Sequence, residues 1–318
     1  KGTRMKSKLP KVLHQAAGKP MLQHVIDAAD AAGARRNIVV TGFGGEVVRQ
    51  WIGDSVEYVE QHEQLGTGHA VLQTKELLLG ERGTIMVLCG DTPLLTAELL
   101  ARFHEEHVQS GAKATVLTAM MPNAKGYGRI IRRENGEVLK IVEHKDATEE
   151  ERAIHEVNAG IYCFDAQALF TALAEVTNDN AQGEYYLPDV LGILRNAGEK
   201  IWAVVADNYE STLGINSRSQ LAVAERILRR RKVEEIMSEG VTVIDPDTTF
   251  IDAEVRVGMD TILYPFTFLE GMTVIGEDCR IGPSVRFQNM VVGDGVTAHF
   301  TYAHDAVIEH HADLGQFT

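Results

Sequence analysis

The sequence predicts an α/β protein in three parts: a Rossmann-like domain with a mixed, mainly parallel sheet, a long helix, and the start of a parallel β-helix. Three observations support this prediction. Short apolar runs alternate with helical patterns over residues 20–205. An unbroken helical pattern covers 216–239, and beyond it apolar residues recur at every sixth position. The alternation is typical of a sheet covered by helices, and the period of six is typical of a β-helix.

The first part begins with an amphipathic helix from Pro20 through Ala29, which Gly33 is placed to end. The apolar run at 37–40 then predicts a buried strand. Further predicted strands cover 56–59, 84–89, 114–119, 138–142 and 157–164, and predicted helices cover 67–79, 95–110, 165–175 and 184–197. A sheet of this kind binds its ligand outside the carboxyl ends of its strands.

The last part is identified by its hexapeptide period. One apolar residue stands at each sixth position in two series separated by a phase shift: Val257, Leu263, Leu269, Ile275, Ile281 and Phe287, then Met290, Val296, Tyr302, Ile308 and Leu314. In a β-helix these residues stack inward. Because a β-helix that stops at residue 318 has an open end, we expect the chain to be a piece of a longer protein. The predicted domains are 1–215, a linker helix at 216–240 and the β-helix at 241–318.

Composition limits the class of protein. The chain has 318 residues, enough for two domains, and a formal net charge of −14. This acidic balance argues against nucleic-acid binding and against binding to anionic membranes. No apolar run is long enough to span a membrane. The three widely spaced cysteines match neither a disulfide framework nor a zinc site, which suits a reducing cytoplasm.

The amino-terminal segment is basic although the protein is acidic. Six Lys or Arg residues precede the first carboxylate, Asp27. Gly2 and Thr3 lie among them, so the backbone can approach a phosphate that the side chains neutralise. On charge alone, an exposed and fraying terminus explains the segment equally well.

Two further motifs follow predicted strands. Residues 61–70 place Gly66 and Gly68 around Thr67 at the start of a helix, where backbone N–H groups are exposed. Gln61 and Gln64 offer the donors and acceptors that suit a nucleobase edge. The motif lacks the Lys-Ser/Thr of a Walker loop. The second motif, Cys89-Gly90-Asp91, places a carboxylate at a strand end, where it suits Mg²⁺ among phosphates; a helix N-cap or an Asx turn is the alternative.

The remaining motifs are less specific when taken singly. Glycines 126 and 128 allow close approach to a ligand or form a hairpin turn. Glu143 and Asn158 are suited to sugar hydroxyls, whereas 144–146 is better explained as a charged loop capping the next helix. An aromatic pair at 185–186 occurs more often in a core than in a ligand site. Asn216 serves equally well as the N-cap of the long helix.

Taken in order, these motifs closely resemble the bacterial bifunctional N-acetylglucosamine-1-phosphate uridylyltransferase / glucosamine-1-phosphate N-acetyltransferase family. The resemblance covers nearly the whole chain, from Lys-Gly-Thr-Arg-Met through Glu-Gln-Leu-Gly-Thr-Gly-His-Ala, Gly-Tyr-Gly-Arg-Ile and Asn-Ala-Gln-Gly-Glu-Tyr-Tyr to the hexapeptides. It implies a cytoplasmic enzyme of cell-wall precursor synthesis that uses UTP, N-acetylglucosamine 1-phosphate and Mg²⁺. It also implies a left-handed β-helix that forms a homotrimer and uses acetyl-CoA in a second reaction.

The resemblance also implies roles for individual residues. Arg4 and Lys11 would contact phosphates and act as the catalytic residues. Uracil and ribose would be bound by Gln61, Gly66 and Thr67, and the substrate site beside the metal would be formed by Cys89, Gly90 and Asp91. The N-acetylglucosamine part would be bound by Gly128, Glu143 and Asn158. Its acetyl group would contact Glu184 and Tyr186. Asp91 and Asn216 would bind Mg²⁺ and lie in the substrate site.

The chain departs from the family pattern at both ends. The family has a strand and Leu-Ala-Ala-Gly immediately before Lys-Gly-Thr-Arg, and we expect these residues to precede Lys1 in the protein. The tail stops before the family's acetyl-transfer residues, so this piece is not expected to acetylate. Two other functions stay open: another sugar-1-phosphate nucleotidyltransferase, using glucose 1-phosphate with dTTP or ATP, and a non-catalytic assembly module.

Overall fold

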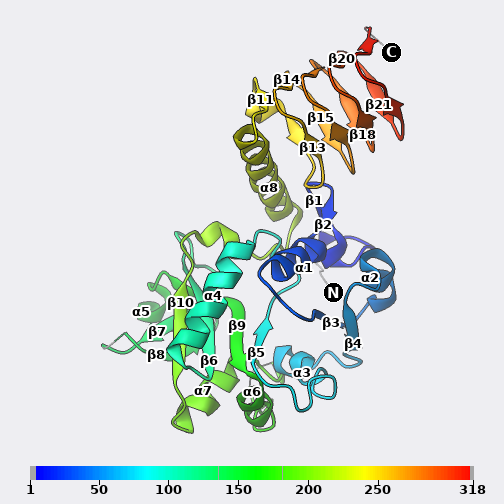
Figure 1. Cartoon of the computed structure of the whole chain (residues 1–318). Helices are drawn as coiled ribbons and strands as arrows, with labels where there is room; N and C mark the ends of the chain where they lie inside the picture. The colour runs from blue at the N-terminus through cyan, green and yellow to red at the C-terminus, as the bar shows by residue number, and fades with distance from the viewer. Residues whose placement is uncertain (1–4, 135, 181, 316–318) are drawn as a thin grey trace. The chain divides into compact units, whose positions relative to one another are not determined.

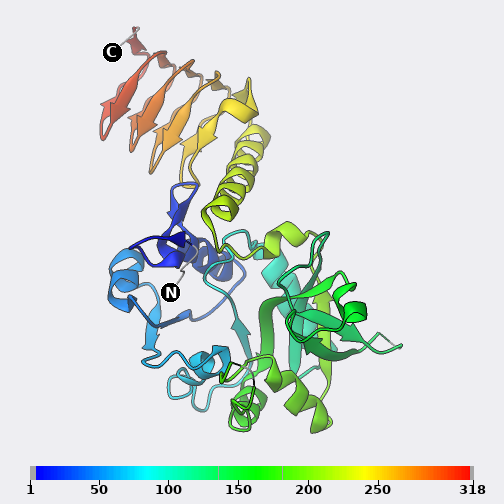
Figure 2. The same cartoon turned by 180° about the vertical axis from the view of Figure 1, so that it is seen from behind.

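The computed structural model describes residues 5–134, 136–180 and 182–315, and the chain forms two compact units (Figures 1 and 2). The first unit contains Lys1–Leu13 and Met21–Ile215, and the second contains His14–Pro20 and Asn216–Thr318. Residues 14–20 therefore fold with the second unit, although their sequence position lies within the range expected for the first domain. Among the described residues, no helix is both long and apolar enough to cross a membrane.

The first unit is built on a mixed six-stranded sheet, as the sequence predicts. The strand order is β10-β6-β9-β7-β8, and β5 also pairs with β9. Among its described strand pairs, β10 and β6 run parallel, whereas β5, β6 and β7 are antiparallel to β9, so this sheet has more antiparallel pairs than expected. The strand bounds are β5 Thr84–Val87, β6 Ala114–Met120, β7 Arg129–Arg132, β8 Val138–Val142, β9 Glu156–Asp165 and β10 Ile201–Val205.

Helices cover this sheet through amphipathic faces. In α4, Thr96 caps the first turn by accepting from Leu99 N, Gly111 ends the helix at φ +65°, and Phe103 is buried between these ends. The helical elements are η2 Lys11–Leu13, α1 Met21–Ala31, α2 Gly45–Ile52, α3 Thr67–Leu72, α4 Ala97–Ser110, α5 Glu149–Arg152, α6 Ala166–Leu173, α7 Asp189–Asn196 and η3 Tyr209–Thr212.

Several elements differ from the sequence prediction. The strand β3 (Ile38–Thr41) pairs with β4 (Glu57–Glu60) in a separate two-stranded parallel sheet, and its side chains are half-buried rather than buried. The predicted helix at 67–79 ends at Leu72, and the one at 184–197 begins only at Asp189. The elements α2, β7 and β10 were not expected. Thr148, in a capping box with Glu151, caps α5, so the prediction that 144–146 caps it is wrong.

The second unit begins with a hairpin and a long helix. Strands β1 (Gln15–Ala16) and β2 (Lys19–Pro20) are joined by Ala17 and Gly18, both at positive φ. The Ala17 N–H donates to Glu225 in α8 (Arg218–Ser238), and its carbonyl accepts from Ala253 N at 3.0 Å. The Ser217 hydroxyl caps α8 by accepting from Gln220 N at 3.2 Å, so the alternative N-cap role of Asn216 is wrong.

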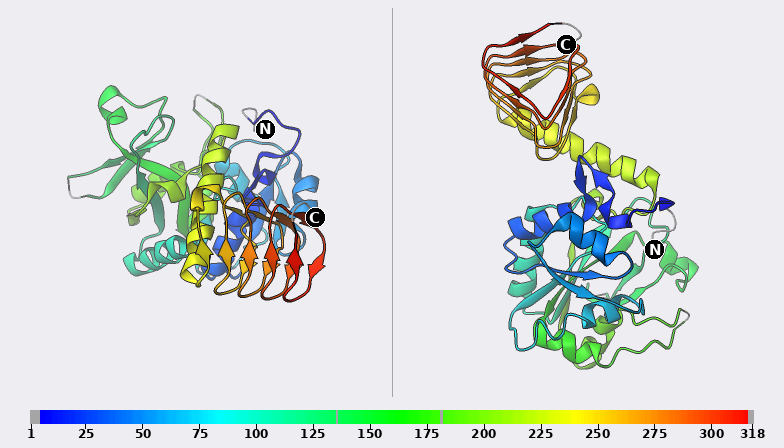
Figure 3. Two further views of the ribbon diagram at one scale, coloured as in Figure 1. Left: turned by 90° about the horizontal axis from the view of Figure 1, so that it is seen from above. Right: turned by 90° about the vertical axis from the view of Figure 1, so that its right-hand side faces the viewer.

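Beyond α8, short strands stack in three parallel sheets that surround one apolar core (Figure 3). This arrangement is a parallel β-helix, as the sequence predicts. The η4 turn Pro246–Thr248 precedes β12. The strands are β11 Thr242–Val243, β12 Phe250–Ile251, β13 Arg256–Val257, β14 Ile262–Leu263, β15 Phe268–Glu270, β16 Val274–Ile275, β17 Arg280–Ile281, β18 Arg286–Gln288, β19 Val291–Val292, β20 Thr297–Ala298, β21 Tyr302–His304, β22 Val307–Ile308 and β23 Asp313–Leu314.

The inward residues follow the predicted period through Phe287 and then change phase. Phe268 pairs with Arg286, 18 positions on, whereas Arg286 pairs with Tyr302, only 16 positions on, because the coil shortens. The residue that faces the core is therefore Ala303, and the prediction that Tyr302 stacks inward is wrong, since Tyr302 is 57% exposed. Met290 and Val296 are fully buried, as expected of core positions.

The two phases predict different costs of truncation. Phe287→Ala should lower the free energy of unfolding of the second unit by about 3–5 kcal/mol, because it leaves a cavity in a close-packed core. Tyr302→Ala should cost below about 1 kcal/mol, because the ring is exposed. Urea titration followed by circular dichroism measures both. A larger cost for Tyr302→Ala than for Phe287→Ala would contradict the observed phase.

Candidate active site

The basic segment meets the strand-end carboxylate in the first unit. Lys11 lies in η2. Leu13 anchors this turn, because its side chain is fully buried and its N–H donates a hydrogen bond of 3.0 Å to the Pro10 carbonyl. The Lys11 ammonium forms an ion pair with Asp91 Oδ2, and both side chains are about one-fifth exposed. Cation and carboxylate therefore lie together at a position open to solvent.

The turn that carries Asp91 is closed by other groups. Thr92 donates from its hydroxyl to the Cys89 carbonyl at 2.6 Å, and Thr96 is the N-cap of the following helix. The alternative role of Asp91 as N-cap is therefore wrong, and an Asx turn is excluded because the residue two positions on, Pro93, has no N–H to donate. Gly90 allows a close approach, because a Cβ there would lie 3.2 Å from Leu22 in α1.

The donor set around Asp91 fits a hard divalent cation. Among the described residues, its carboxylate is held by the ammonium group of Lys11 rather than by backbone N–H groups. Among the residues that the structure describes, no group of three or more His, Cys, Asp or Glu side chains is placed to hold a metal. A cation at Asp91 would therefore rely on substrate oxygens for much of its coordination, which is the usual arrangement for Mg²⁺.

Cys89 packs beside this carboxylate as a buried thiol. Its Sγ lies 3.3 Å from the Gly160 carbonyl oxygen, to which it donates. Burial, and to a smaller extent the charge of Asp91, raise the pKa of the thiol to about 12. Cys89 is therefore a protonated packing group of the site at neutral pH.

The glycine-rich motif is held by backbone contacts with a distant segment. Tyr185 N donates to the Leu65 carbonyl at 2.7 Å, and Gly68 N donates to the Tyr185 carbonyl at 2.8 Å. The Thr67 hydroxyl accepts from Leu187 N at 3.0 Å. A Cβ on Gly66, whose φ is +114°, would lie 2.5 Å from the Tyr185 carbonyl oxygen. Only glycine fits this contact without displacing the backbone.

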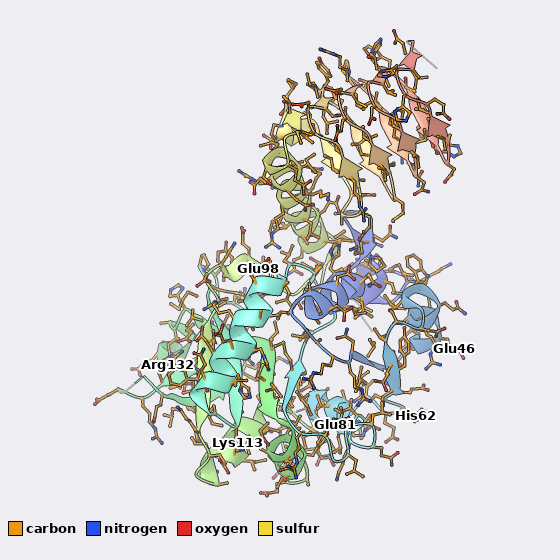
Figure 4. The ribbon with its side chains drawn as sticks, viewed as in Figure 1. Glu46, His62, Glu81, Glu98, Lys113 and Arg132 are labelled. Carbon is orange, nitrogen blue, oxygen red and sulfur yellow. The ribbon has the colours of Figure 1, made fainter. Side chains whose placement is uncertain are left out.

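The same contact brings two groups of predicted residues together. Gln61 is buried, and its Nε2 donates to the Gly66 carbonyl at 3.0 Å and lies 3.0 Å from His69 Nδ1. His62, next in sequence, is exposed at the end of β4 (Figure 4). The Gly66 carbonyl of the loop therefore fixes the Gln61 amide. Glu184 and Tyr186 are the sequence neighbours of Tyr185, whose backbone is hydrogen-bonded to the loop.

A bulge in the central strand positions Asn158. The register of β6 and β9 passes from Leu117–Ile161 to Thr118–Asn158, so Ala159 and Gly160 are extra residues, and Gly160 has φ +75°. Asn158 Oδ1 accepts from Gly160 N at 2.9 Å, and Nδ2 donates to the Tyr162 hydroxyl at 2.7 Å. Gly160 was not among the predicted site residues, although glycine within a strand is a signal for a bulge.

The turn at 126–128 lies against this bulge. Asn158 N donates to the Gly128 carbonyl at 2.9 Å, and a Cβ on Gly128 would lie 3.3 Å from Glu143 Oε1. Burial of the carboxyl group, and to a smaller extent the charges of Asp146 and Asp189, raise the pKa of Glu143. Gly128, Glu143 and Asn158 are thus neighbours, as the resemblance implies.

Charge interactions connect these parts further. Burial, and then the charge of Asp91, raise the pKa of Tyr127, a residue that sequence reasoning did not select. Desolvation, followed by Glu184 and Glu143, raises the pKa of Tyr186. These shifts place Tyr127 near the charge of Asp91, and Tyr186 near the charges of Glu184 and Glu143.

Two predicted residues are not part of this description. Arg4 lies outside the described residues. Asn216 belongs to the second unit, directly after Ile215, whose N–H donates to the Asp91 carbonyl at 2.8 Å. The shared role of Asp91 and Asn216 in binding a metal stays a prediction.

Comparison with known proteins agrees with the fold and the motifs. A family model described as nucleotidyl transferase matches residues 1–214. The structure is similar to a UDP-glucose pyrophosphorylase complexed with UDP-glucose, with a TM-score of 0.59 and 18% identity over 72% of this chain and 95% of that one. At that identity the likeness concerns the fold alone.

Closer relatives identify the family. The chain is 52% identical over 99% of its length to the bifunctional protein GlmU of Geobacillus sp. (strain WCH70), covering 69% of that protein. It is 49% identical over 100% of its length to GlmU of Halalkalibacterium halodurans, covering 70% of that protein. The chain belongs to the GlmU family of nucleotidyltransferases.

The contact at Gly66 predicts a specific sensitivity. Gly66→Ala should lower the free energy of unfolding by about 2 kcal/mol or more, because the new Cβ meets the Tyr185 carbonyl at a φ that disfavours alanine. Gly192→Ala is the matched control, since Gly192 lies in α7 with open space around its Cα. That control should be neutral or stabilising by up to about 1 kcal/mol. Thermal denaturation compares them, and equal effects would refute the steric argument.

The buried thiols predict a pH dependence. Burial raises the pKa of Cys89 to about 12 and also raises the pKa values of Cys163 and Cys279. A raised pKa leaves only about one part in ten thousand of Cys89 as reactive thiolate at pH 8. Native protein should therefore react slowly with a thiol reagent at pH 8, whereas all three cysteines should react in denaturant. Rapid labelling of Cys89 in native protein would contradict its burial.

Proposed function

We propose that this protein transfers a uridylyl group from UTP to N-acetylglucosamine 1-phosphate, giving UDP-N-acetylglucosamine and pyrophosphate, in cytoplasmic synthesis of cell-wall precursors. One observation carries the proposal. The first unit pairs the Lys11 ammonium with the strand-end carboxylate of Asp91 at a position open to solvent, and in the same unit it brings Gly128, Glu143 and Asn158 together. Membership of the GlmU family supports the choice of substrates.

The proposed reaction is a displacement at phosphorus. A phosphate oxygen of N-acetylglucosamine 1-phosphate attacks the α-phosphorus of UTP and forms a P–O bond. The bond from that phosphorus to the bridging oxygen of the β-phosphate breaks, and pyrophosphate leaves with the electron pair. The sugar phosphate is already ionised at neutral pH, so no general base is needed. Catalysis then depends on positioning and on stabilisation of the developing negative charge.

Lys11 and Asp91 have the central roles in this proposal. Lys11 neutralises phosphate charge, and Arg4 of the same segment is proposed to assist it. Asp91 would hold Mg²⁺, together with Asn216. When bound, Mg²⁺ screens the phosphate charges and orients the phosphates. The ion pair between Lys11 and Asp91 keeps the cationic group at this position before substrates arrive.

Recognition is assigned to the two flanking regions. Gln61, Gly66 and Thr67 would bind uracil and ribose, and the contact with 185–187 supports this by fixing the loop. Gly128, Glu143 and Asn158 would bind the sugar, and Glu184 and Tyr186 would enclose its acetyl group. Raised pKa values of Glu143 and Tyr186 accord with a crowded, partly desolvated pocket of this kind.

The second unit is assigned by the family alone. We propose that the intact protein forms a homotrimer through its β-helix and acetylates glucosamine 1-phosphate with acetyl-CoA. The chain spans about 70% of the length of the relatives. Sedimentation of the intact protein tests the trimer; a monomer at micromolar concentration would contradict it.

The proposal predicts the effect of removing each charged partner. With Mg²⁺, UTP and N-acetylglucosamine 1-phosphate, the intact protein should release pyrophosphate. Asp91→Asn and Lys11→Met should each reduce kcat by about a hundredfold or more, because each removes charge stabilisation from the transition state. A coupled pyrophosphate assay measures both. Arg133→Met is the control, since Arg133 is exposed and pairs with Glu137 away from this site.

Three further measurements separate this proposal from its alternatives. A panel with dTTP, ATP and glucose 1-phosphate should show lower kcat/KM than the proposed pair. Preference for another pair would assign the protein to a different sugar-1-phosphate nucleotidyltransferase activity. Near-normal turnover by Asp91→Asn would refute the metal assignment, and calorimetry without UTP binding would refute the proposed function as a whole.

A further inference from the structure

Arg129, in β7, is a buried cation without a carboxylate partner among the described residues. It is only 2% exposed, and its Nε has no hydrogen-bond partner in that part of the chain. Its guanidinium donates instead to the carbonyls of Tyr127 and, at 3.4 Å, Arg152. A fully buried arginine is uncommon unless it is paired, because desolvation of the charge is costly.

The neighbouring arginine on the same strand shows what a stabilising pair looks like. Arg132 binds both carboxylate oxygens of Glu156, at 2.6 and 2.8 Å (Figure 4 labels Arg132). This bidentate ion pair neutralises the charge of the guanidinium and satisfies its hydrogen-bond donors together. Among the described residues Arg129 lacks such a carboxylate partner. Its burial is better explained by the two main-chain carbonyls, of Tyr127 and Arg152, that its N–H groups hold in place.

Arg152 extends this contact to a second loop. From the end of α5, its Nε donates to the His144 carbonyl at 3.4 Å and its NH2 donates to the Lys145 carbonyl at 3.5 Å. The backbone carbonyl of Arg152 is in turn an acceptor for Arg129. Two arginines therefore connect the turn at 126–128 with the loop at 143–146.

The connected loops carry the proposed sugar contacts. Gly128 ends the first loop, and a Cβ on it would lie 3.3 Å from the carboxylate of Glu143, which begins the second. The Gly128 carbonyl also accepts from Asn158 N. Any change in the separation of these loops would therefore move Gly128, Glu143 and Asn158 relative to one another.

We propose that Arg129 and Arg152 are positioning residues that set the spacing of the 126–128 and 143–146 loops and thereby determine sugar selectivity. Neither arginine needs to touch the substrate, since both act through main-chain carbonyls. This inference rests on the proposed function, because it assumes that these loops bind the sugar phosphate.

Two conservative variants test the proposal. In Arg129→Lys the charge stays, but one ammonium group cannot span the Tyr127 and Arg152 carbonyls. Arg152→Lys likewise loses the fork to His144 and Lys145, and because Arg152 is exposed this variant should fold normally. Arg133→Lys is the matched control, since Arg133 lies beside β7 and is not a donor to these carbonyls.

Steady-state kinetics of the intact protein should show a selective effect. In both variants the KM for N-acetylglucosamine 1-phosphate should rise by about tenfold, because the sugar-binding atoms are misplaced, while the KM for UTP should change by less than about twofold. Preference over glucose 1-phosphate should narrow by a similar factor. An unchanged sugar KM would overturn the proposal, and so would an equal rise in the KM values of both substrates, which is the mark of a merely structural role.

A second measurement separates failure of this inference from failure of the proposed function. Amide hydrogen exchange at 126–128 and 143–146 should be faster in both variants than in wild type and in Arg133→Lys, with exchange at 65–68 unchanged. Unaltered exchange would refute the positioning role whatever the activity. If wild type does not turn over these substrates while the variants still exchange faster, the proposed function fails and the loop connection stands.

Discussion

Three hydrogen bonds between residues 65–68 and 185–187 are the constraint on which the proposed nucleotide side of the site depends. The pairs of residues lie about 120 positions apart, as in the bond from Leu187 N to the Thr67 hydroxyl. Closing so long a loop costs entropy, which only a well-packed scaffold can offset. The contact is possible because Gly66 lacks a Cβ, and it sets where α3 begins and where Gln61 is buried.

The scaffold behind these loops is the mixed sheet centred on β9. That strand pairs with β5, β6 and β7, and its middle residues are buried. The bulge at Ala159 and Gly160 interrupts its register and brings the Gly160 carbonyl to the Cys89 thiol, next to Asp91. A strand with one bulge thus links the proposed metal position to the proposed sugar contacts. Arg129 and Arg152 together connect the loops at 126–128 and 143–146 through main-chain carbonyls.

The sequence predicts the parts of this protein whose signals are local. The hexapeptide period identifies the β-helix, and the ordered motifs supply the resemblance from which the site residues are proposed. Among the inward residues predicted after Phe287, Tyr302 is wrong, because shorter coils exchange it for Ala303 as the inward residue. The antiparallel pairing of β9 with β5 and β6 depends on residues far apart in the chain, and no periodicity predicts it.

The central claim is that the α-phosphorus of UTP becomes bonded to the sugar phosphate. It is tested most directly by giving the intact protein UTP labelled at the α-phosphorus, with Mg²⁺ and N-acetylglucosamine 1-phosphate, and separating the products. The account predicts that the label appears in UDP-N-acetylglucosamine and that the pyrophosphate is unlabelled. Label in pyrophosphate or in free UMP, or a sugar nucleotide formed without label, would contradict it.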